Sequence, residues 1–309
     1  MVAPRVSVLM PVYNGMPYLA QAVESILTQS FRDFEFIIVD DCSNDDTIMY
    51  LRSITDKRMV VLPLPENRGV TGALQEGMRH VKGKYVARLD ADDVAKPNRL
   101  QIQVDYLENN PSIGLLGSSL ELIDADGNFL KHVNLTRNDI EIRWRFLVKN
   151  PFFHSTVMFR YDLVKQNRLG YSRKHGEDYQ LWVDLLKFCK GAILRDELIQ
   201  YRSHAQSWTY TKMAQQQTAF DEINGAVLEQ YLPGITSKVE IRKFVSWMRN
   251  PEIRNEGGTL FWDTYRLLVN AFASIEVEPS ARKHFVKNKL NLIQGNSVWI
   301  RLKSLMKSR

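Results

Sequence analysis

The fold of this chain is decided by the stretch Tyr85-Val-Ala-Arg-Leu-Asp-Ala-Asp-Asp-Val-Ala-Lys-Pro-Asn-Arg-Leu100. Its apolar start, residues 85–89, predicts a buried strand, and Pro97 favours the first turn of a following helix. The loop between them carries three carboxylates, Asp90, Asp92 and Asp93. Such close carboxylates repel one another unless a cation, hydrogen-bond donors or open water compensates their charge, and a divalent ion with oxygen ligands does so. Taken alone, the loop is more typical of a solvated acidic turn, so its meaning depends on the rest of the chain.

The same order of strand and helix comes before this stretch. Apolar runs at residues 6–10, 34–39 and 59–62 predict strands, and apolar residues at helical spacing follow each run. Strands that alternate with helices predict an α/β fold with a mostly parallel sheet flanked by helices. In such folds ligands bind at the carboxyl ends of the strands.

Three polar loops are expected at those carboxyl ends, at residues 11–14, 40–43 and 90–93. No Gly-x-Gly-x-x-Gly follows the first strand, and no Gly-Lys-Ser/Thr phosphate loop exists in the sequence. The usual dinucleotide and P-loop sites are therefore excluded. A phosphate group bound at this edge would instead be held through a metal ion.

The composition is that of a globular protein, with 309 residues, 44% hydrophobic and 25% charged. No segment has the roughly 18 apolar residues needed to span a bilayer, and the N-terminus lacks the pattern of a signal peptide. A cytoplasmic location is expected. The two cysteines, Cys42 and Cys189, have neither metal-ligand nor disulfide spacing, so we interpret both as free thiols.

Four blocks of sequence, in order and in register, resemble the family 2 glycosyltransferases. They are Pro11-Val-Tyr-Asn14 after the first strand, Ile37-Ile-Val-Asp-Asp-Cys-Ser43, Glu66-Asn-Arg-Gly69, and Leu89-Asp-Ala-Asp-Asp93 with Pro97 and Arg99-Leu100. The resemblance covers about residues 5–207. It implies an inverting enzyme of the GT-A fold, which is Rossmann-like, that uses a nucleotide-sugar donor and a bound Mn²⁺ or Mg²⁺.

The resemblance also implies roles for single residues on the donor side. Asp41 would accept a hydrogen bond from the base, Arg68 would lie near the base or diphosphate, and Asp90 near the ribose or sugar. Asp92 would bind the metal, and His204, in a Tyr-Arg-x-His ending, is a second candidate ligand. The residues expected to contact the nucleotide sugar are Pro11, Val12, Tyr13, Asn14, Asp41, Arg68, Asp90 and Ala91.

Glu177-Asp178 precedes an apolar helical face, so both acids are expected in the first turn of a helix, where negative charge is favourable. They could simply cap that helix. The resemblance implies instead that Asp178 is the general base and that Glu177 orients the acceptor or the helix. His154 and Trp182 are acceptor-side candidates, although a histidine before a strand and a tryptophan on an apolar helical face are more often structural.

A second Asp-x-Asp occurs at Asp124-Ala-Asp126, followed by Gly127. Asp-Gly between two strand-like runs is a hairpin signal, so we interpret this motif as a structural turn.

The last third of the chain has helical periodicity, so we predict a catalytic domain at residues 1–210 and a helical extension at 211–309. Residues 282–309 combine basic and apolar side chains without any acid. Part of the net charge of +6 therefore lies in a segment that would either bind an anionic membrane surface or pack on the protein. Nucleic acid is not an expected partner, because no known binding module occurs.

The sequence thus predicts an inverting, metal-dependent glycosyltransferase. Its donor would be a UDP-sugar, and its acceptor a saccharide, plausibly lipid-linked, in bacterial surface polysaccharide assembly. A catalytically silent sugar-binding or scaffold subunit is the alternative from another class. A sugar nucleotidyltransferase is a weaker one, because the glycine-rich loop of those enzymes is missing after the first strand.

Overall fold

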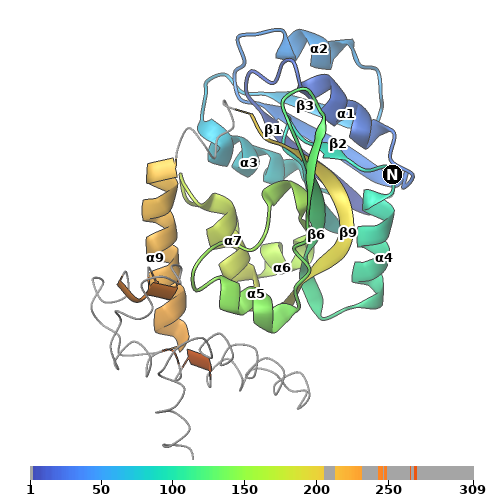
Figure 1. Ribbon diagram of the computed structural model, residues 1–309. Coiled ribbons are helices and arrows are strands. Elements are labelled where there is room, and N and C mark those ends of the chain that lie inside the picture. Colours follow the sequence, from blue (N-terminus) through green and yellow to red (C-terminus); the bar gives the residue numbers. More distant parts are fainter. Residues whose placement is uncertain are drawn as a thin grey trace, which may run out of the picture. The chain divides into compact units, whose positions relative to one another are not determined.

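The structure is a computed structural model that describes residues 3–204 and 213–231, with short pieces at 243–245, 247–248, 265 and 268–269. Within these residues, nine strands form one sheet in the order β3-β2-β1-β4-β8-β6-β9-β5, and β7 pairs with β6 (Figure 1). The strands are β1 (Val6–Val12), β2 (Phe34–Asp40), β3 (Met59–Pro63), β4 (Tyr85–Arg88), β5 (Val94–Ala95), β6 (Ile113–Ile123), β7 (Phe129–Val133), β8 (Met158–Arg160) and β9 (Lys190–Arg202). The helices are α1 (Leu19–Leu27), α2 (Thr47–Ser53), α3 (Gly69–His80), α4 (Arg99–Asn109), α5 (Asp139–Arg145), α6 (Tyr161–Gln166), α7 (Glu177–Leu185) and α9 (Met213–Tyr231), with a 3₁₀ turn, η1, at His154–Thr156.

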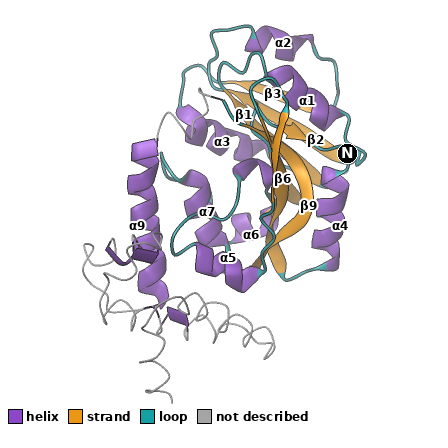
Figure 2. Ribbon diagram, viewed as in Figure 1, coloured by secondary structure: helices purple, strands orange, loops and turns teal. Residues whose placement is uncertain are grey.

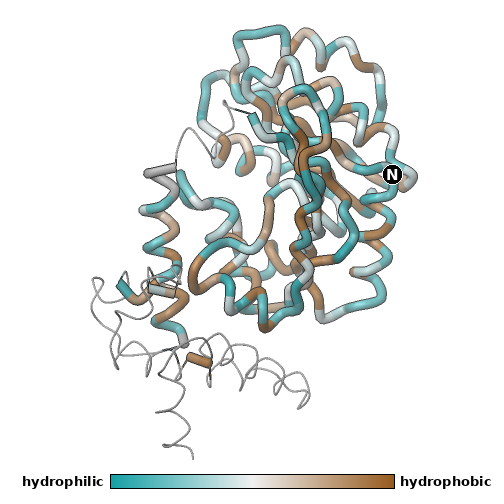
Figure 3. Tube along the Cα trace, viewed as in Figure 1, coloured by the Kyte–Doolittle hydropathy of each residue, from teal (hydrophilic) through white to brown (hydrophobic). Residues whose placement is uncertain are grey.

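The first four strands form the parallel half of the sheet, as predicted. β1 pairs in parallel with β2 and β4, and all seven residues of β1 are buried. Helices cover both faces, which explains why these strands are continuous apolar runs (Figures 2 and 3). At Gly77 in α3, an added Cβ would lie 2.3 Å from Cδ1 of Leu9, so a larger residue would push this helix away from the sheet.

The other half of the sheet is mixed, and this corrects the prediction of a mostly parallel sheet in detail. β8 lies between β4 and β6 and is antiparallel to both. β6 is parallel to β9 and antiparallel to β7, and the short β5 is antiparallel to β9. Strand direction depends on where distant segments pair, which the local pattern of apolar residues does not encode.

The expected strand, acidic loop and helix around residues 85–100 are present, with one change. The helix α4 begins at Arg99, after Asn98, so Pro97 precedes it rather than opening its first turn. β5 lies in between, and its pairing of Val94 with Gln200 ties the end of the acidic loop to β9. That pairing brings the acidic loop close to the end of β9.

The chain divides into two compact units, one of residues 1–142 and 150–223, the other of residues 143–149 and 224–309. In the second unit Tyr265 packs edge-on against Trp144 and Trp247, with ring centroids 5.5 and 5.9 Å apart. The predicted boundary at 210/211 and the basic segment 282–309 lie outside the described residues and stay predictions. None of the helices that the structure describes is long and apolar enough to cross a bilayer.

Candidate active site

The three aspartates of the acidic loop are held by three different groups. Asp90 forms an ion pair with Arg88 and accepts a hydrogen bond from the hydroxyl of Ser155 (3.0 Å). The carboxylate of Asp93 accepts the backbone N–H of Arg202 (2.8 Å) and is fully buried. The side chain of the third, Asp92, is 31% exposed and contacts His204.

Asp92 and His204 meet although 112 residues separate them in sequence, with 2.9 Å between Oδ2 and Nε2. Burial, and after it the charge of Asp90, raises the pKa of Asp92 above its ordinary value. The other nitrogen of His204, Nδ1, is buried and has no hydrogen-bond partner among the described residues. A carboxylate oxygen and an imidazole nitrogen that lie this close together are ligand types that fit a divalent metal such as Mn²⁺.

A second group of potential ligands lies on strands β6, β7 and β9, where ligand atoms of Glu121, His132 and Glu197 all fall within 4.8 Å of one another. There, however, Glu121 already pairs with Lys96, and His132 with Glu197. The lysine compensates one of the two carboxylates in this cluster, whereas Asp92 has no lysine or arginine as an ion-pair partner among the described residues.

The loops that follow β1 and β2 lie side by side. The backbone N–H of Asn14 donates to Ser43 Oγ (2.9 Å), and the side-chain oxygen of Asn14 accepts the N–H of Asn44 (2.9 Å). Asp45, whose role the sequence did not reveal, accepts the N–H groups of Met16 and Thr47. The side chain of Tyr13, next to these two loops, is 49% exposed, so a base or ribose could reach it.

The remaining residues predicted on the donor side lie in β1, at the end of β2 and in two loops. Asp41 is buried and accepts the N–H of Arg68 (2.7 Å), so the loop that carries Arg68 is fixed against the end of β2. Pro11 and Val12 are buried within β1, which runs two residues beyond the predicted strand end at residue 10. Their predicted contact with the nucleotide stays a prediction. Ala91 is half-buried in the acidic loop.

Glu177 and Asp178 open helix α7, as predicted, directly after Gly176 in the left-handed conformation (φ 68°). Burial, and next the charge of Asp178, raises the pKa of Glu177 to about 8. Burial also raises the pKa of Asp178, to about 6, while hydrogen bonds from the N–H of Tyr179 (2.7 Å) and from Asn150 Nδ2 (2.8 Å) hold it lower than that of its neighbour. Of the two adjacent acids, Asp178 is thus the one that loses its proton more readily.

Comparison with known proteins agrees with this geometry. Residues 7–168 match the profile of the family described as Glycosyl transferase family 2. This chain belongs to that family. The O-antigen biosynthesis glycosyltransferase WbnJ of Escherichia coli is 30% identical over 215 residues, which cover 68% of this chain and 84% of WbnJ.

Solved structures resemble the fold of this family 2 glycosyltransferase. The crystal structure of S. aureus TarS 1–349 in complex with UDP has a TM-score of 0.60 and 17% identity, covering 92% of this chain and 87% of that one. The mannosyltransferase PcManGT from Pyrobaculum calidifontis, in complex with GDP-Man and Mn²⁺, has a TM-score of 0.56 and 16% identity, covering 100% and 89%. These likenesses confirm the predicted GT-A fold.

The two residues predicted to lie on the acceptor side, Trp182 and His154, make contacts inside this glycosyltransferase. Trp182 is completely buried, with ring centroids 5.4 Å from Phe159 and 5.8 Å from His154, so it cannot stack on an acceptor sugar in this structure. His154, in η1, uses its Nε2 to accept a hydrogen bond from Arg88 Nε (3.0 Å). Burial, and next the charge of Arg88, lowers the pKa of His154 well below its usual range. His154 is thus a hydrogen-bond partner of Arg88, and its predicted contact with the acceptor stays a prediction.

Two arginines important to the site of the glycosyltransferase were missed by sequence reasoning, Arg88 and Arg202. Arg202 is 2% exposed, and its guanidinium donates to the carbonyls of Asp92 (2.9 Å) and Ala125 (3.0 Å) and to the side chain of Gln21 (2.7 Å). It thereby links the acidic loop, the β6–β7 turn and α1. For Arg88 the available signal was a charged residue inside the otherwise apolar run 85–89, because such a residue is rarely buried unless paired.

Asp124 is a structural residue, as its hairpin context predicted. Its carboxylate accepts the N–H groups of Asp126 (2.9 Å) and Asn128 (2.8 Å) within the β6–β7 turn, where Gly127 has a φ of 90°. We therefore expect Asp124→Asn to lower the thermal stability slightly and to keep sugar transfer and metal affinity at wild-type levels. Melting temperature measures the first effect, and steady-state kinetics and metal titration measure the second. A loss of metal affinity would mean that Asp124, and not only the acidic loop, takes part in metal binding.

Proposed function

We propose that this glycosyltransferase moves a sugar from a nucleoside-diphosphate sugar, with UDP as the first choice of nucleotide, to a hydroxyl group of a saccharide acceptor with inversion at the anomeric carbon. The observation that carries the proposal is the position of Asp178. Apart from burial and a backbone hydrogen bond, the charge of Asp90 is the next largest influence on the pKa of Asp178. The base candidate therefore lies within electrostatic reach of the acidic loop that would hold the donor.

In the proposed reaction Asp178 accepts the proton of the acceptor hydroxyl while the hydroxyl oxygen attacks the anomeric carbon. The bond from that carbon to the diphosphate breaks on the opposite face, and its electron pair leaves with the diphosphate. Glu177, protonated near pH 7, donates a hydrogen bond to orient the acceptor. No covalent intermediate is needed, because one displacement inverts the centre.

A divalent ion held by Asp92 and His204 would supply positive charge to the departing diphosphate. Asp90, whose carboxylate contacts Arg88 and Ser155, would accept hydrogen bonds from the ribose or sugar. The exposed ring of Tyr13 lies next to the loops that follow β1 and β2. Arg68 is held near the end of β2 by the hydrogen bond from its backbone N–H to Asp41. Together these residues bind the donor and keep its diphosphate next to the acidic loop.

The comparisons support the choice of donor and pathway. TarS was crystallised with UDP and with UDP-GlcNAc, PcManGT with GDP-Man and Mn²⁺, and WbnJ is named for O-antigen biosynthesis. A saccharide on a lipid carrier at the membrane surface would be an acceptor consistent with such a pathway and with the basic segment 282–309.

Calorimetric titration of UDP, GDP and dTDP, each with and without Mn²⁺, tests the proposal. We expect micromolar binding of one nucleotide that requires the metal. Absence of binding under both conditions would favour a catalytically silent sugar-binding subunit. Release of pyrophosphate from a nucleoside triphosphate and a sugar phosphate would indicate a nucleotidyltransferase instead.

The pH dependence of turnover gives a separate prediction. A general base must be ionised to accept a proton, so kcat should rise with pH through the pKa of Asp178, about 6, and level off above it. Measurement of kcat at saturating donor and acceptor from pH 5 to pH 8 checks this. A profile that falls over this range as pH rises would mean that the titrating group acts as an acid.

A further inference from the structure

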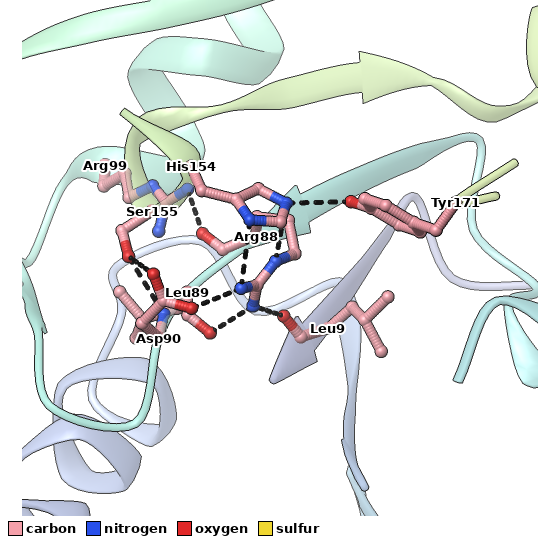
Figure 4. Close-up of polar contacts among 8 residues, drawn as sticks. All are labelled: Leu9, Arg88, Leu89, Asp90, Arg99, His154, Ser155 and Tyr171. Atoms are coloured by element: carbon pink, nitrogen blue, oxygen red, sulfur yellow. Dashed lines mark hydrogen bonds and ion pairs between the residues drawn. The ribbon is translucent and has the colours of Figure 1, made fainter. Parts of the chain in front are cut away.

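Arg88 is a charged residue in the buried strand β4, and its side chain is 0% exposed. Its guanidinium contacts four groups from different parts of the chain (Figure 4). Nη1 donates to the carbonyl oxygens of Leu9 (2.9 Å) and Leu89 (2.5 Å), Nη2 pairs with Asp90, and Nε donates to Nε2 of His154 (3.0 Å). All three of its nitrogens are thus used, and its fork fixes the start of the acidic loop to β1.

Two other guanidinium groups are buried in this region, and neither contacts the carboxylate of Asp90: Arg202 donates to the carbonyl of Asp92, and Arg99 donates elsewhere. Nη2 of Arg99 donates to the carbonyl oxygens of Arg88 (2.7 Å) and Val157 (3.3 Å), and Nε donates to Gln103 (3.0 Å). Among the described residues, Asp90 therefore has Arg88 as its only ion-pair partner. The contact of Arg88 Nη2 with Asp90 Oδ1, together with the hydroxyl of Ser155 on Oδ2, fixes both oxygens of this carboxylate.

Arg88 also faces the elements that support the proposed base. His154 Nε2 lies 3.0 Å from the hydroxyl of Tyr171, and the rings of His154 and Tyr171 both pack edge-on against Trp182 of α7, with centroids 5.8 and 6.5 Å away. Arg88 thus contacts Asp90 directly and reaches the first two turns of α7 through packed side chains.

We propose that Arg88 is a positioning residue of the transfer reaction, which orients Asp90 toward the donor and supplies one buried positive charge to both the acidic loop and the start of α7. The inference rests on the proposed function. The groups that influence Asp178 are Glu177 on its own helix, Asp90 and Arg88 on the opposite segment, Tyr171, and the amide of Asn150. Of these, only Arg88 is a cation, and besides the hydrogen bonds from Tyr179 and Asn150 its charge lowers the pKa of Asp178.

The test compares Arg88→Lys, Arg88→Met and Ser155→Ala by donor KM and by the pH profile of kcat. A lysine keeps the charge but cannot contact Leu9, Asp90 and His154 together, so we expect a donor KM raised about tenfold with an unchanged acidic limb. Without the charge, Arg88→Met should raise the donor KM as much and also move the acidic limb to higher pH, because Asp178 then loses its proton less readily. Ser155→Ala, which removes a neutral contact to Asp90, should raise the donor KM and leave the limb in place.

Thermal unfolding of each variant shows whether it is folded. If Arg88→Met does not fold, Arg88→Lys decides the question, because the lysine keeps a cation next to Asp90. An Arg88→Lys enzyme with wild-type donor KM would overturn the inference. So would a folded Arg88→Met enzyme whose acidic limb stays in place. In either case an active wild-type enzyme leaves the proposed function intact, whereas a wild-type protein that neither binds a nucleotide nor transfers a sugar ends the proposed function itself.

Discussion

Asp178→Asn is expected to reduce kcat by about 10²–10⁴-fold while nucleotide affinity stays at the wild-type level. The amide has nearly the shape of the carboxylate, and its single oxygen can keep one of the two hydrogen bonds, which Tyr179 donates to Oδ1 and Asn150 to Oδ2. It cannot accept a proton, however, so the acceptor hydroxyl would have to attack without a base. Single-turnover kinetics with a radiolabelled donor, together with calorimetric titration of the nucleotide, separate the chemical step from binding.

Two matched controls lie on the same helix. Glu177→Gln mimics the protonated form that Glu177 has near pH 7, so we expect a loss of less than about tenfold. Asp184 pairs with Lys187 near the end of α7, and Asp184→Asn should retain full activity. If Asp178→Asn turned over like the wild type, or if Glu177→Gln were the more damaging change, Asp178 would not be the base.

Asp92→Asn should abolish the metal dependence of nucleotide binding and lower kcat about 10²–10³-fold. The amide preserves the size of the side chain and its contact with His204, but it removes the charge that would attract a divalent ion. The leaving diphosphate would then develop its charge without a counter-ion. Titration of Mn²⁺ into the protein, and of nucleotide with and without the metal chelator EDTA, measures both consequences.

Asp124→Asn is the control for this change, because it alters the other Asp-x-Asp by the same chemistry in a structural turn. His204→Ala adds a test of the second ligand and should weaken metal binding without changing nucleotide binding in the absence of metal. Wild-type Mn²⁺ affinity in Asp92→Asn would rule out Asp92 as a ligand. The cluster of Glu121, His132 and Glu197 would then be the next site to examine.

The corrections show which features of the site depend on contacts between distant residues. Trp182 and Val12 were both expected to lie beside a ligand. Both side chains are buried, because α7 and β1 pack into the core of the protein. The sheet turned out mixed because β8 enters between β4 and β6 from a segment more than 65 residues further along the chain than β4. Apolar patterning predicts that a segment is a strand, but its direction and neighbours are set by packing.

The sequence alone determined the features that are local in the chain. They are the alternating strands and helices, the acidic loop after β4, the hairpin turn at Asp124 and the acidic start of α7, because turn chemistry and apolar spacing act over a few residues. Only the tertiary structure decided that Asp92 meets His204, that Arg88 pairs with Asp90 and His154, and that the pKa of Glu177 is raised further than that of Asp178. These outcomes depend on burial and on charges brought together from distant segments, and both arise only when the sheet has formed.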